Sequence, residues 1–190
     1  EGLRVFGPRR NAAILEGSKA FSKDLMKKYN IPTAAYETFT SAEEAKKYLE
    51  TSEYPIVLKA DGLALGKGVL ICQTKEEAME GVNELMLDKK FGSAGNTIVI
   101  EEFMTGREVS VLSFVDGSTI KIMSSAQDHK RAKDGDQGLN TGGMGNFSPS
   151  PFYTKEVDDF CKAHIYQATV DAMKAEGRPF KGVIFFGLML

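Results

Sequence analysis

Two apolar runs separated by a glycine-rich loop constrain the fold of this chain more than any other stretch. Residues 55–60 and 69–72 are rich in valine, isoleucine and leucine, as strands are. Between them, three glycines within seven positions allow backbone N–H groups to approach an anion, and Lys59 and Lys67 add positive charge. The segment predicts a β-hairpin folded over phosphate groups. The simpler alternative is an ordinary hairpin with two solvated lysines.

This loop differs from a Walker A motif at two positions. Asp61 stands where that motif has its first glycine, and Gly68 stands where it has serine or threonine. A strand rather than a helix follows, so no helix N-terminus is expected to hold the phosphate.

Composition excludes several classes of protein. With 190 residues, 42% hydrophobic content and 26% charge, the chain is typical of a globular protein of one or two domains. A net charge of −2 indicates no broad basic face, so we expect no nucleic-acid partner. No apolar run reaches the length of a membrane span and no signal peptide opens the chain, so we expect a cytoplasmic protein without membrane contact. Cys72 and Cys161 are expected to be buried, reduced thiols.

Helix and strand patterns alternate along the chain. Capping residues predict helices that begin at Ser18, Ser41, Thr74 and Thr154, the last of which ends near Gly177. Apolar runs predict strands at residues 3–6, 55–60, 69–72, 97–103, 108–115, 119–123 and 182–190. This order indicates an α/β (α+β) fold with small antiparallel elements.

Acidic residues at the end of an apolar strand suggest a nucleoside site. Glu101 could accept a hydrogen bond from an adenine amino group, and Glu108 could hold ribose hydroxyls. The backbone near Glu102 and Met104 could read the edge of the ring. The alternative is a charged strand end followed by a solvated turn.

Residues 126–151 show no apolar period and are expected to form a long functional loop. Residues 128–131 could bind an anionic substrate that carries hydroxyl groups, and residues 140–145 could present backbone donors to a phosphate or carboxylate. The polar portion at 133–138 is expected to be disordered. His129 is the better functional candidate of the two histidines, because His164 lies on the apolar stripe of the last helix and is expected in the core.

Together these motifs resemble the ATP-grasp superfamily and, within it, the phosphoribosylamine–glycine ligase family. The resemblance covers essentially the whole chain, and its most specific strings are Gln127–Arg131 and Asn140–Gly145. It implies a small lid lobe at residues 39–110 and part of a larger core lobe at 13–38 and 111–190. Residues 1–12 would be the tail of an N-terminal domain, and the fold is expected to be truncated at both ends.

The resemblance implies an ATP-dependent ligation in purine biosynthesis. Glycine would form a glycyl phosphate, and phosphoribosylamine would displace the phosphate to give glycinamide ribonucleotide, ADP and phosphate. Lys67, Asp128 and Lys130 would be catalytic. The residues expected to bind ATP are Lys59, Gly66, Lys67, Gly68, Glu101, Glu102, Met104 and Glu108. The residues expected to bind glycine and phosphoribosylamine are Asp128, His129, Lys130, Asn140, Thr141, Gly142, Gly143 and Met144.

The resemblance also sets expectations about metal and activity. Magnesium, or manganese, would be needed by the intact enzyme, with ligands beyond Leu190 and none in this chain. We therefore expect the chain as given to be inactive. Its oligomeric state stays open. Two alternatives remain: another ATP-grasp ligase that joins a different carboxylate and amine, or an ATP-binding module without catalysis.

Overall fold

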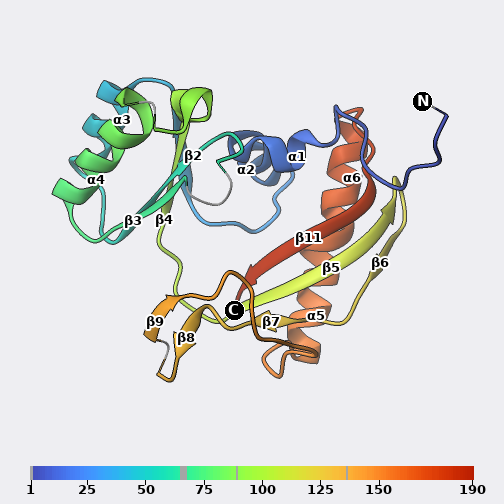
Figure 1. Ribbon diagram of the computed structural model, residues 1–190. Helices are drawn as coiled ribbons and strands as arrows, with labels where there is room; N and C mark the ends of the chain where they lie inside the picture. Colours follow the sequence, from blue (N-terminus) through green and yellow to red (C-terminus); the bar gives the residue numbers. More distant parts are fainter. Residues whose placement is uncertain (1, 65–67, 89, 136) are drawn as a thin grey trace. The chain divides into compact units, whose positions relative to one another are not determined.

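The computed structural model describes residues 2–64, 68–88, 90–135 and 137–190, which fall into two compact units (Figure 1). One unit is Arg10–Met104, and the other joins the residues up to Arg9 to Thr105–Leu190. Residues 13–38 thus pack with the hairpin, whereas we expected them with residues 111–190. One reason is that Ser18 hydrogen-bonds to Asp61 at the end of the hairpin's first strand. The expected limits of the tail, lid lobe and core lobe stay predictions.

The first unit is built on a four-stranded antiparallel sheet. Its strands are β1 (Tyr36–Phe39), β2 (Ile56–Ala60), β3 (Val69–Cys72) and β4 (Ile98–Glu102), in the order β1-β4-β2-β3. The pairing of β2 with β3 confirms the two strands of the predicted hairpin. The register sets Lys59 opposite Val69 on one side and Val99 on the other.

Helices lie against both faces of this sheet. The unit contains α1 (Ile14–Gly17), α2 (Lys19–Lys28), α3 (Ala42–Leu49) and α4 (Lys75–Val82), followed by the π-helical turn η1 (Asn83–Leu87) and the 3₁₀ turn η2 (Gly92–Asn96). The predicted caps are confirmed: Ser18, Ser41 and Thr74 each accept a backbone N–H of the first helical turn, at 3.0, 3.4 and 3.3 Å. Leucines and valines of α3, α4 and η1 pack on alternate residues of β2 and β4 in a buried core.

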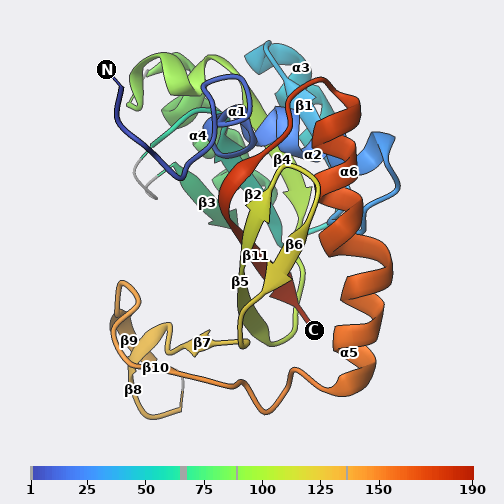
Figure 2. The same cartoon turned by 90° about the vertical axis from the view of Figure 1, so that its right-hand side faces the viewer.

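The second unit has a three-stranded antiparallel sheet. Its strands are β5 (Glu108–Asp116), β6 (Ile120–Ile122) and β11 (Lys181–Met189), in the order β11-β5-β6. The chain turns tightly at Asp116, whose carboxylate accepts the N–H groups of Ser118 and Thr119 at 3.0 and 2.8 Å. A helical column lies along this sheet in both Figures 1 and 2.

That column is one helix with a π-helical turn inside it. It runs through α5 (Lys155–Cys161), the turn η3 (Lys162–Tyr166) and α6 (Gln167–Ala175), so the predicted helix is confirmed. The prediction that His164 lies in the core is wrong: the residue is exposed, and its ring lies 4.7 Å from that of Phe160. A π-turn holds more residues than an α-turn, so the buried stripe rotates. Tyr166 takes the buried position and packs on Phe186 at 4.8 Å.

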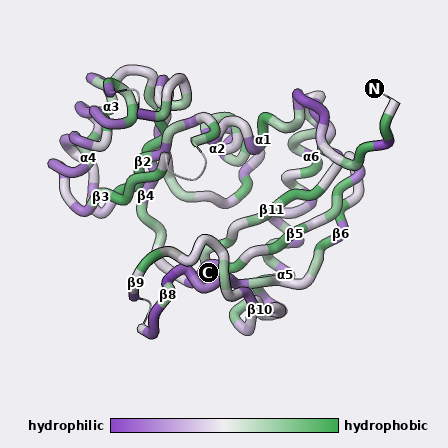
Figure 3. Tube along the Cα trace, in the orientation of Figure 1, coloured by the Kyte–Doolittle hydropathy of each residue, from purple (hydrophilic) through white to green (hydrophobic). Residues whose placement is uncertain are grey.

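The stretch at 126–151 is more ordered than its composition predicts. β7 (Gln127–Asp128) pairs with β10 (Asn146–Phe147), and β8 (Arg131–Lys133) pairs with β9 (Gln137–Asn140). The expectations of an irregular loop and of disorder after Lys133 are therefore wrong for the residues described. Backbone pairing of such short strands leaves no side-chain period to detect, and β8 is hydrophilic (Figure 3).

Three further expectations can be compared with the structure. Residues 3–6 form no strand; Leu3, Val5 and Phe6 are 76%, 75% and 53% exposed, and no described strand pairs with them. Their apolar side chains alone were a misleading signal. Cys72 and Cys161 are free and buried, as predicted. Within the described ranges, every helix is too short or too polar to cross a membrane.

Candidate functional site

The first part of the site lies on the sheet face opposite the core of the first unit. Lys59 on β2 and Glu101 on β4 are diagonal neighbours on adjacent strands, so their long side chains meet. The Lys59 Nζ lies 2.8 Å from the Glu101 Oε2. The lysine side chain is 28% exposed, whereas the glutamate is only 8% exposed. This pairing supplies the partner that a charge at the end of an apolar strand needs.

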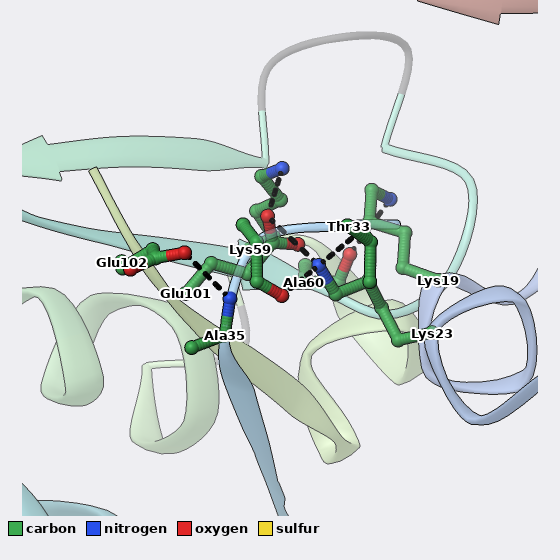
Figure 4. A network of polar contacts seen from close by, with 9 residues as sticks. Lys19, Lys23, Thr33, Ala35, Lys59, Ala60, Glu101 and Glu102 are labelled. Atoms are coloured by element: carbon green, nitrogen blue, oxygen red, sulfur yellow. Dashed lines mark hydrogen bonds and ion pairs between the residues drawn. The ribbon is translucent and has the colours of Figure 1, made fainter. Parts of the chain in front are cut away.

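A second lysine approaches the same carboxylate from α2. The Nζ of Lys23 lies 3.6 Å from the Glu101 Oε2, and the Lys23 side chain is 6% exposed (Figure 4). Burial lowers the pKa of Lys23, and the charge of Glu101 opposes that shift. We call Lys23, Lys59 and Glu101 the hairpin cluster.

A third set of contacts holds the end of β2. The carboxylate of Asp61 accepts the Ser18 hydroxyl at 3.0 Å and the Ala20 N–H at 2.7 Å, at the N-terminus of α2. Lys19 donates from its Nζ to the carbonyls of Ala60 and Gly62, at 2.8 and 3.1 Å. Burial lowers the pKa of Lys19. The base of the glycine-rich loop is therefore fastened to α2.

The glycine-rich loop itself is described at its two ends. A Cβ added at Gly68 would lie 2.6 Å from that of Ala64, so only glycine fits there. Beside the loop is a cavity of about 270 Å³, lined by Asp61, Gly62, Leu63, Phe91, Ser93, Ala94 and Thr97. The expected phosphate-binding residues Gly66 and Lys67 lie outside the described residues.

Glu102 and Met104, which were expected to read the adenine edge, differ in whether their backbone groups are available. Glu102 is already engaged on both sides by Ala35: its N–H donates to the Ala35 carbonyl at 3.0 Å, and its carboxylate accepts the Ala35 N–H at 2.8 Å. Its N–H group is therefore not a spare donor for a ring. Met104 is 42% exposed, so its backbone is the better candidate of the two.

The second part of the site lies in the second unit, where a lysine bridges two acids. Lys130 Nζ lies 2.8 Å from the Glu108 Oε2 and 3.1 Å from the Asp128 Oδ2. The hydrogen bond with Glu108 raises the pKa of Lys130, which therefore stays charged. We call Glu108, Asp128 and Lys130 the loop cluster. The structure thus brings Glu108 to the substrate loop, whereas Glu101 belongs to the other unit.

A cavity of about 590 Å³ opens at the loop cluster. Its lining includes Arg107, Glu108, Gln127, Asp128, His129, Lys130, Arg131 and Phe147. His129 is exposed, its N–H donates to the Gly145 carbonyl at 3.0 Å, and its ring lies 5.4 Å from that of Phe147. Three of the residues expected to bind substrate, Asp128, His129 and Lys130, thus line one hollow.

The Asn140–Gly145 string lies at the end of β9 and in the tight turn after it, and the described residues that line the cavity include none of it. Gly142 and Gly143 have φ values of +66° and +88°, which other residues rarely adopt. The hydroxyl of Thr141 accepts the Gly143 N–H at 3.3 Å and contacts the His129 carbonyl, and the Thr141 carbonyl accepts the Met144 N–H at 3.4 Å. The N–H groups of Gly143 and Met144 thus serve the turn itself, while the Met144 side chain is 78% exposed.

Sequence reasoning assigned no role to several residues at the hairpin. Lys19 and Lys23 are among them, although the spacing of Lys19, Lys23 and Lys27 puts three cations on one side of a helix. That spacing was the available signal. Lysines four residues apart are typical of a solvent-exposed helix face, so the spacing does not predict that Lys23 is buried.

Comparisons with known proteins agree with one another. Residues 17–190 match the family model for the ATP-grasp (A) domain of phosphoribosylglycinamide synthetase. All of the chain aligns at 53% identity with 45% of the phosphoribosylamine–glycine ligase of Streptococcus pyogenes, and at 51% identity with 24% of a bifunctional purine biosynthetic protein of Pichia angusta. A crystal structure of the Thermotoga maritima phosphoribosylamine–glycine ligase matches 98% of the chain with a TM-score of 0.87 and 39% identity, and 47% of that protein is covered. The chain thus spans less than half the length of these relatives.

Proposed function

The chain belongs to the phosphoribosylglycinamide synthetase family of ATP-grasp proteins, and on this premise we propose that it is the nucleotide- and substrate-binding part of a phosphoribosylamine–glycine ligase. In the proposed reaction, the glycine carboxylate attacks the γ-phosphorus of ATP and the bond to ADP breaks. The amine of phosphoribosylamine then attacks the acyl carbon, the bond to phosphate breaks and the amine loses a proton. The product is an amide, with ADP and phosphate released.

The hairpin cluster is proposed to hold ATP. Two lysines against one carboxylate give it a surplus positive charge, which suits a polyphosphate. The same sheet face carries Val57, Val69 and Ile71, of which Val69 and Ile71 are 41% and 54% exposed and could pack against the adenine ring. We assign the ring edge to Glu101 and Met104 and the phosphates to Lys59. Roles for Gly66 and Lys67 stay expectations from the resemblance.

The loop cluster is the observation that carries the proposed choice of substrates. It has two carboxylates against one lysine, so it has a surplus negative charge that suits an amine. Asp128 can accept hydrogen bonds from a substrate amino group, and Lys130 can neutralise the carboxylate or the acyl phosphate that forms from it. Both glycine and phosphoribosylamine combine an amine with an anionic group. His129 lines the cavity, and roles for Asn140, Thr141 and the glycines that follow stay expectations from the resemblance.

A divalent metal is implied by the family but does not fit this part of the protein. Among the residues described, no three His, Cys, Asp or Glu side chains are placed to hold a metal ion. In the hairpin cluster, the carboxylate of Glu101 is already occupied by lysines. We therefore assign no catalytic step to a metal here, and expect the magnesium or manganese of the intact enzyme to be held by other residues. We place the reaction in the cytoplasm, with small-molecule partners alone.

The test is ADP release by the natural full-length protein with and without each substrate. We expect release to require both glycine and phosphoribosylamine, and Lys130→Met to reduce it strongly. Lys155→Met removes an exposed lysine that pairs with Asp159 on α5, outside the residues that line the cavity, and is the matched control. ADP release that is driven by another carboxylate or amine would favour a different ATP-grasp ligase. ATP binding without any turnover would favour a non-catalytic module.

A further inference from the structure

Lys23 is the buried cation of the hairpin cluster, and no contact with a ligand has been assigned to it. Only 5% of the residue is exposed. Its Nζ donates to the Thr33 Oγ1 and to the Ala34 carbonyl, both at 2.8 Å, and lies 5.0 Å from the centre of the Tyr36 ring. Burying an ammonium group is costly unless its charge is balanced, and Glu101 is the carboxylate beside it.

Lys23 and Lys59 share one oxygen of that carboxylate. The Glu101 Oε2 lies 2.8 Å from the Lys59 Nζ and 3.6 Å from the Lys23 Nζ (Figure 4). A single negative charge therefore serves two positive charges. Without Lys23, Glu101 would pair with Lys59 alone, and the pair would be neutral. With Lys23 present, the more exposed ammonium of Lys59 keeps positive charge to offer an anion.

We infer that Lys23 is a positioning residue for the phosphates of the nucleotide, and that it acts through Glu101 without touching the ligand. Lys23 pairs with the Glu101 carboxylate from its buried side and neutralises part of the carboxylate charge. The Lys59 ammonium therefore remains available to an anion at the surface. This inference rests on the proposed role of the hairpin cluster in ATP binding.

The first experiment compares two lysine variants of the natural full-length protein. Lys23→Met keeps the length of the side chain and removes its charge. Lys27→Met removes the same charge one turn further along α2, from an exposed lysine that lies 5.5 Å from the same Tyr36 ring. Binding of ATP and of adenosine is measured by calorimetric titration, and the unfolding temperature of each variant is recorded.

We expect Lys23→Met to weaken ATP binding about tenfold and adenosine binding less than about twofold, because a missing charge affects the phosphates alone. Lys27→Met should leave both affinities within about twofold of wild type. Equal losses for ATP and adenosine in Lys23→Met would show a purely structural role and would overturn the inference. Unchanged ATP affinity in a folded Lys23→Met protein would also overturn it.

A second experiment tests whether the effect passes through the carboxylate. In a Glu101→Gln background Lys59 has already lost its ion pair with the Glu101 carboxylate. Adding Lys23→Met should then change ATP affinity by less than about twofold. A full tenfold loss in that background would show that Lys23 acts independently of Glu101. If the wild-type protein bound no ATP, the proposed function would fail first. If it bound ATP but released no ADP with glycine and phosphoribosylamine, the ligase proposal would fail while the role of Lys23 stayed testable.

Discussion

The hairpin cluster and the loop cluster use the same side chains in opposite proportions and in different surroundings. The first sets two lysines on one buried glutamate, and the second sets one lysine between two acids that are 51% and 20% exposed. Buried charges hold a fixed geometry because an unpaired one is costly, whereas exposed pairs are screened by water and exchange partners easily. If the proposed function holds, the anion site in one unit is preformed and the amine site in the other is adaptable.

The sharpest test of this contrast is to leave the buried carboxylate without a partner. Lys23→Met combined with Lys59→Met would leave Glu101, 8% exposed, facing no cation of the hairpin cluster. We expect the free energy of unfolding to fall by about 3–5 kcal/mol. Lys130→Met in the exposed cluster should lower it by only about 0–1 kcal/mol. Denaturant titration of both variants measures the difference, and equal effects would remove the distinction between the clusters.

Catalysis should depend strongly on the surface lysine of the hairpin cluster. Lys59→Ala removes the charge proposed to stabilise the transferring phosphoryl group, so kcat/KM for ATP should fall by an amount equivalent to about 2–4 kcal/mol. Lys47→Ala, at an exposed position of α3, is the control. Steady-state kinetics on the full-length protein decide the point. A folded Lys59→Ala enzyme with near wild-type kcat/KM would show that the phosphates bind elsewhere.

The loop cluster should affect the other substrates instead. Asp128→Ala removes one of the two carboxylates proposed to receive an amine, and we expect a loss of about 1.5–3 kcal/mol in kcat/KM for glycine or phosphoribosylamine. Direct titration should show nearly unchanged ATP affinity. If ATP binding fell as much as the ligase activity, Asp128 would belong to the nucleotide site and the division between the clusters would not hold.

The smallest expected effect concerns Glu108, which was expected on the ribose and is found beside Lys130. Glu108→Gln replaces one acceptor oxygen with an NH₂ donor and removes the charge of one of the two carboxylates proposed to receive an amine, so we expect the KM for glycine or phosphoribosylamine to rise by an amount equivalent to about 1 kcal/mol. Stability should change little at a half-exposed position. Kinetics with each substrate varied in turn provide the measurement. A rise confined to the KM for ATP would move Glu108 from the amine site to the ribose.

Local signals predicted much of the fold. Ser41 and Thr74 cap their helices because the acceptor and the N–H group lie within one turn of each other. The pairing of β7 with β10 joins residues about twenty positions apart in strands of two residues, and nothing in the sequence marks such a contact. His164 was misplaced for a related reason, since a single π-turn shifts every later position of the helix.

The sequence singled out both partners of the first ion pair but not their pairing. Lys59 on β2 and Glu101 on β4 are diagonal neighbours, whereas the predicted hairpin joined β2 only to β3. Lys23 depends instead on which face of α2 packs toward β4, and a helix with lysines every four residues gives no sign of that. The sequence thus named the residues at the surface of the site and missed the one beneath them.

The two free cysteines make each unit its own reporter. Cys72 is 3% exposed in the first unit and Cys161 is 2% exposed in the second, and burial raises the pKa of both thiols. A thiol in that state reacts with a labelling reagent only when its surroundings open. The rate of labelling at each cysteine therefore reports how often one unit opens, and mass spectrometry can measure it with no engineered probe. Added nucleotide or amine would lower the labelling rate of the cysteine in the unit that binds it.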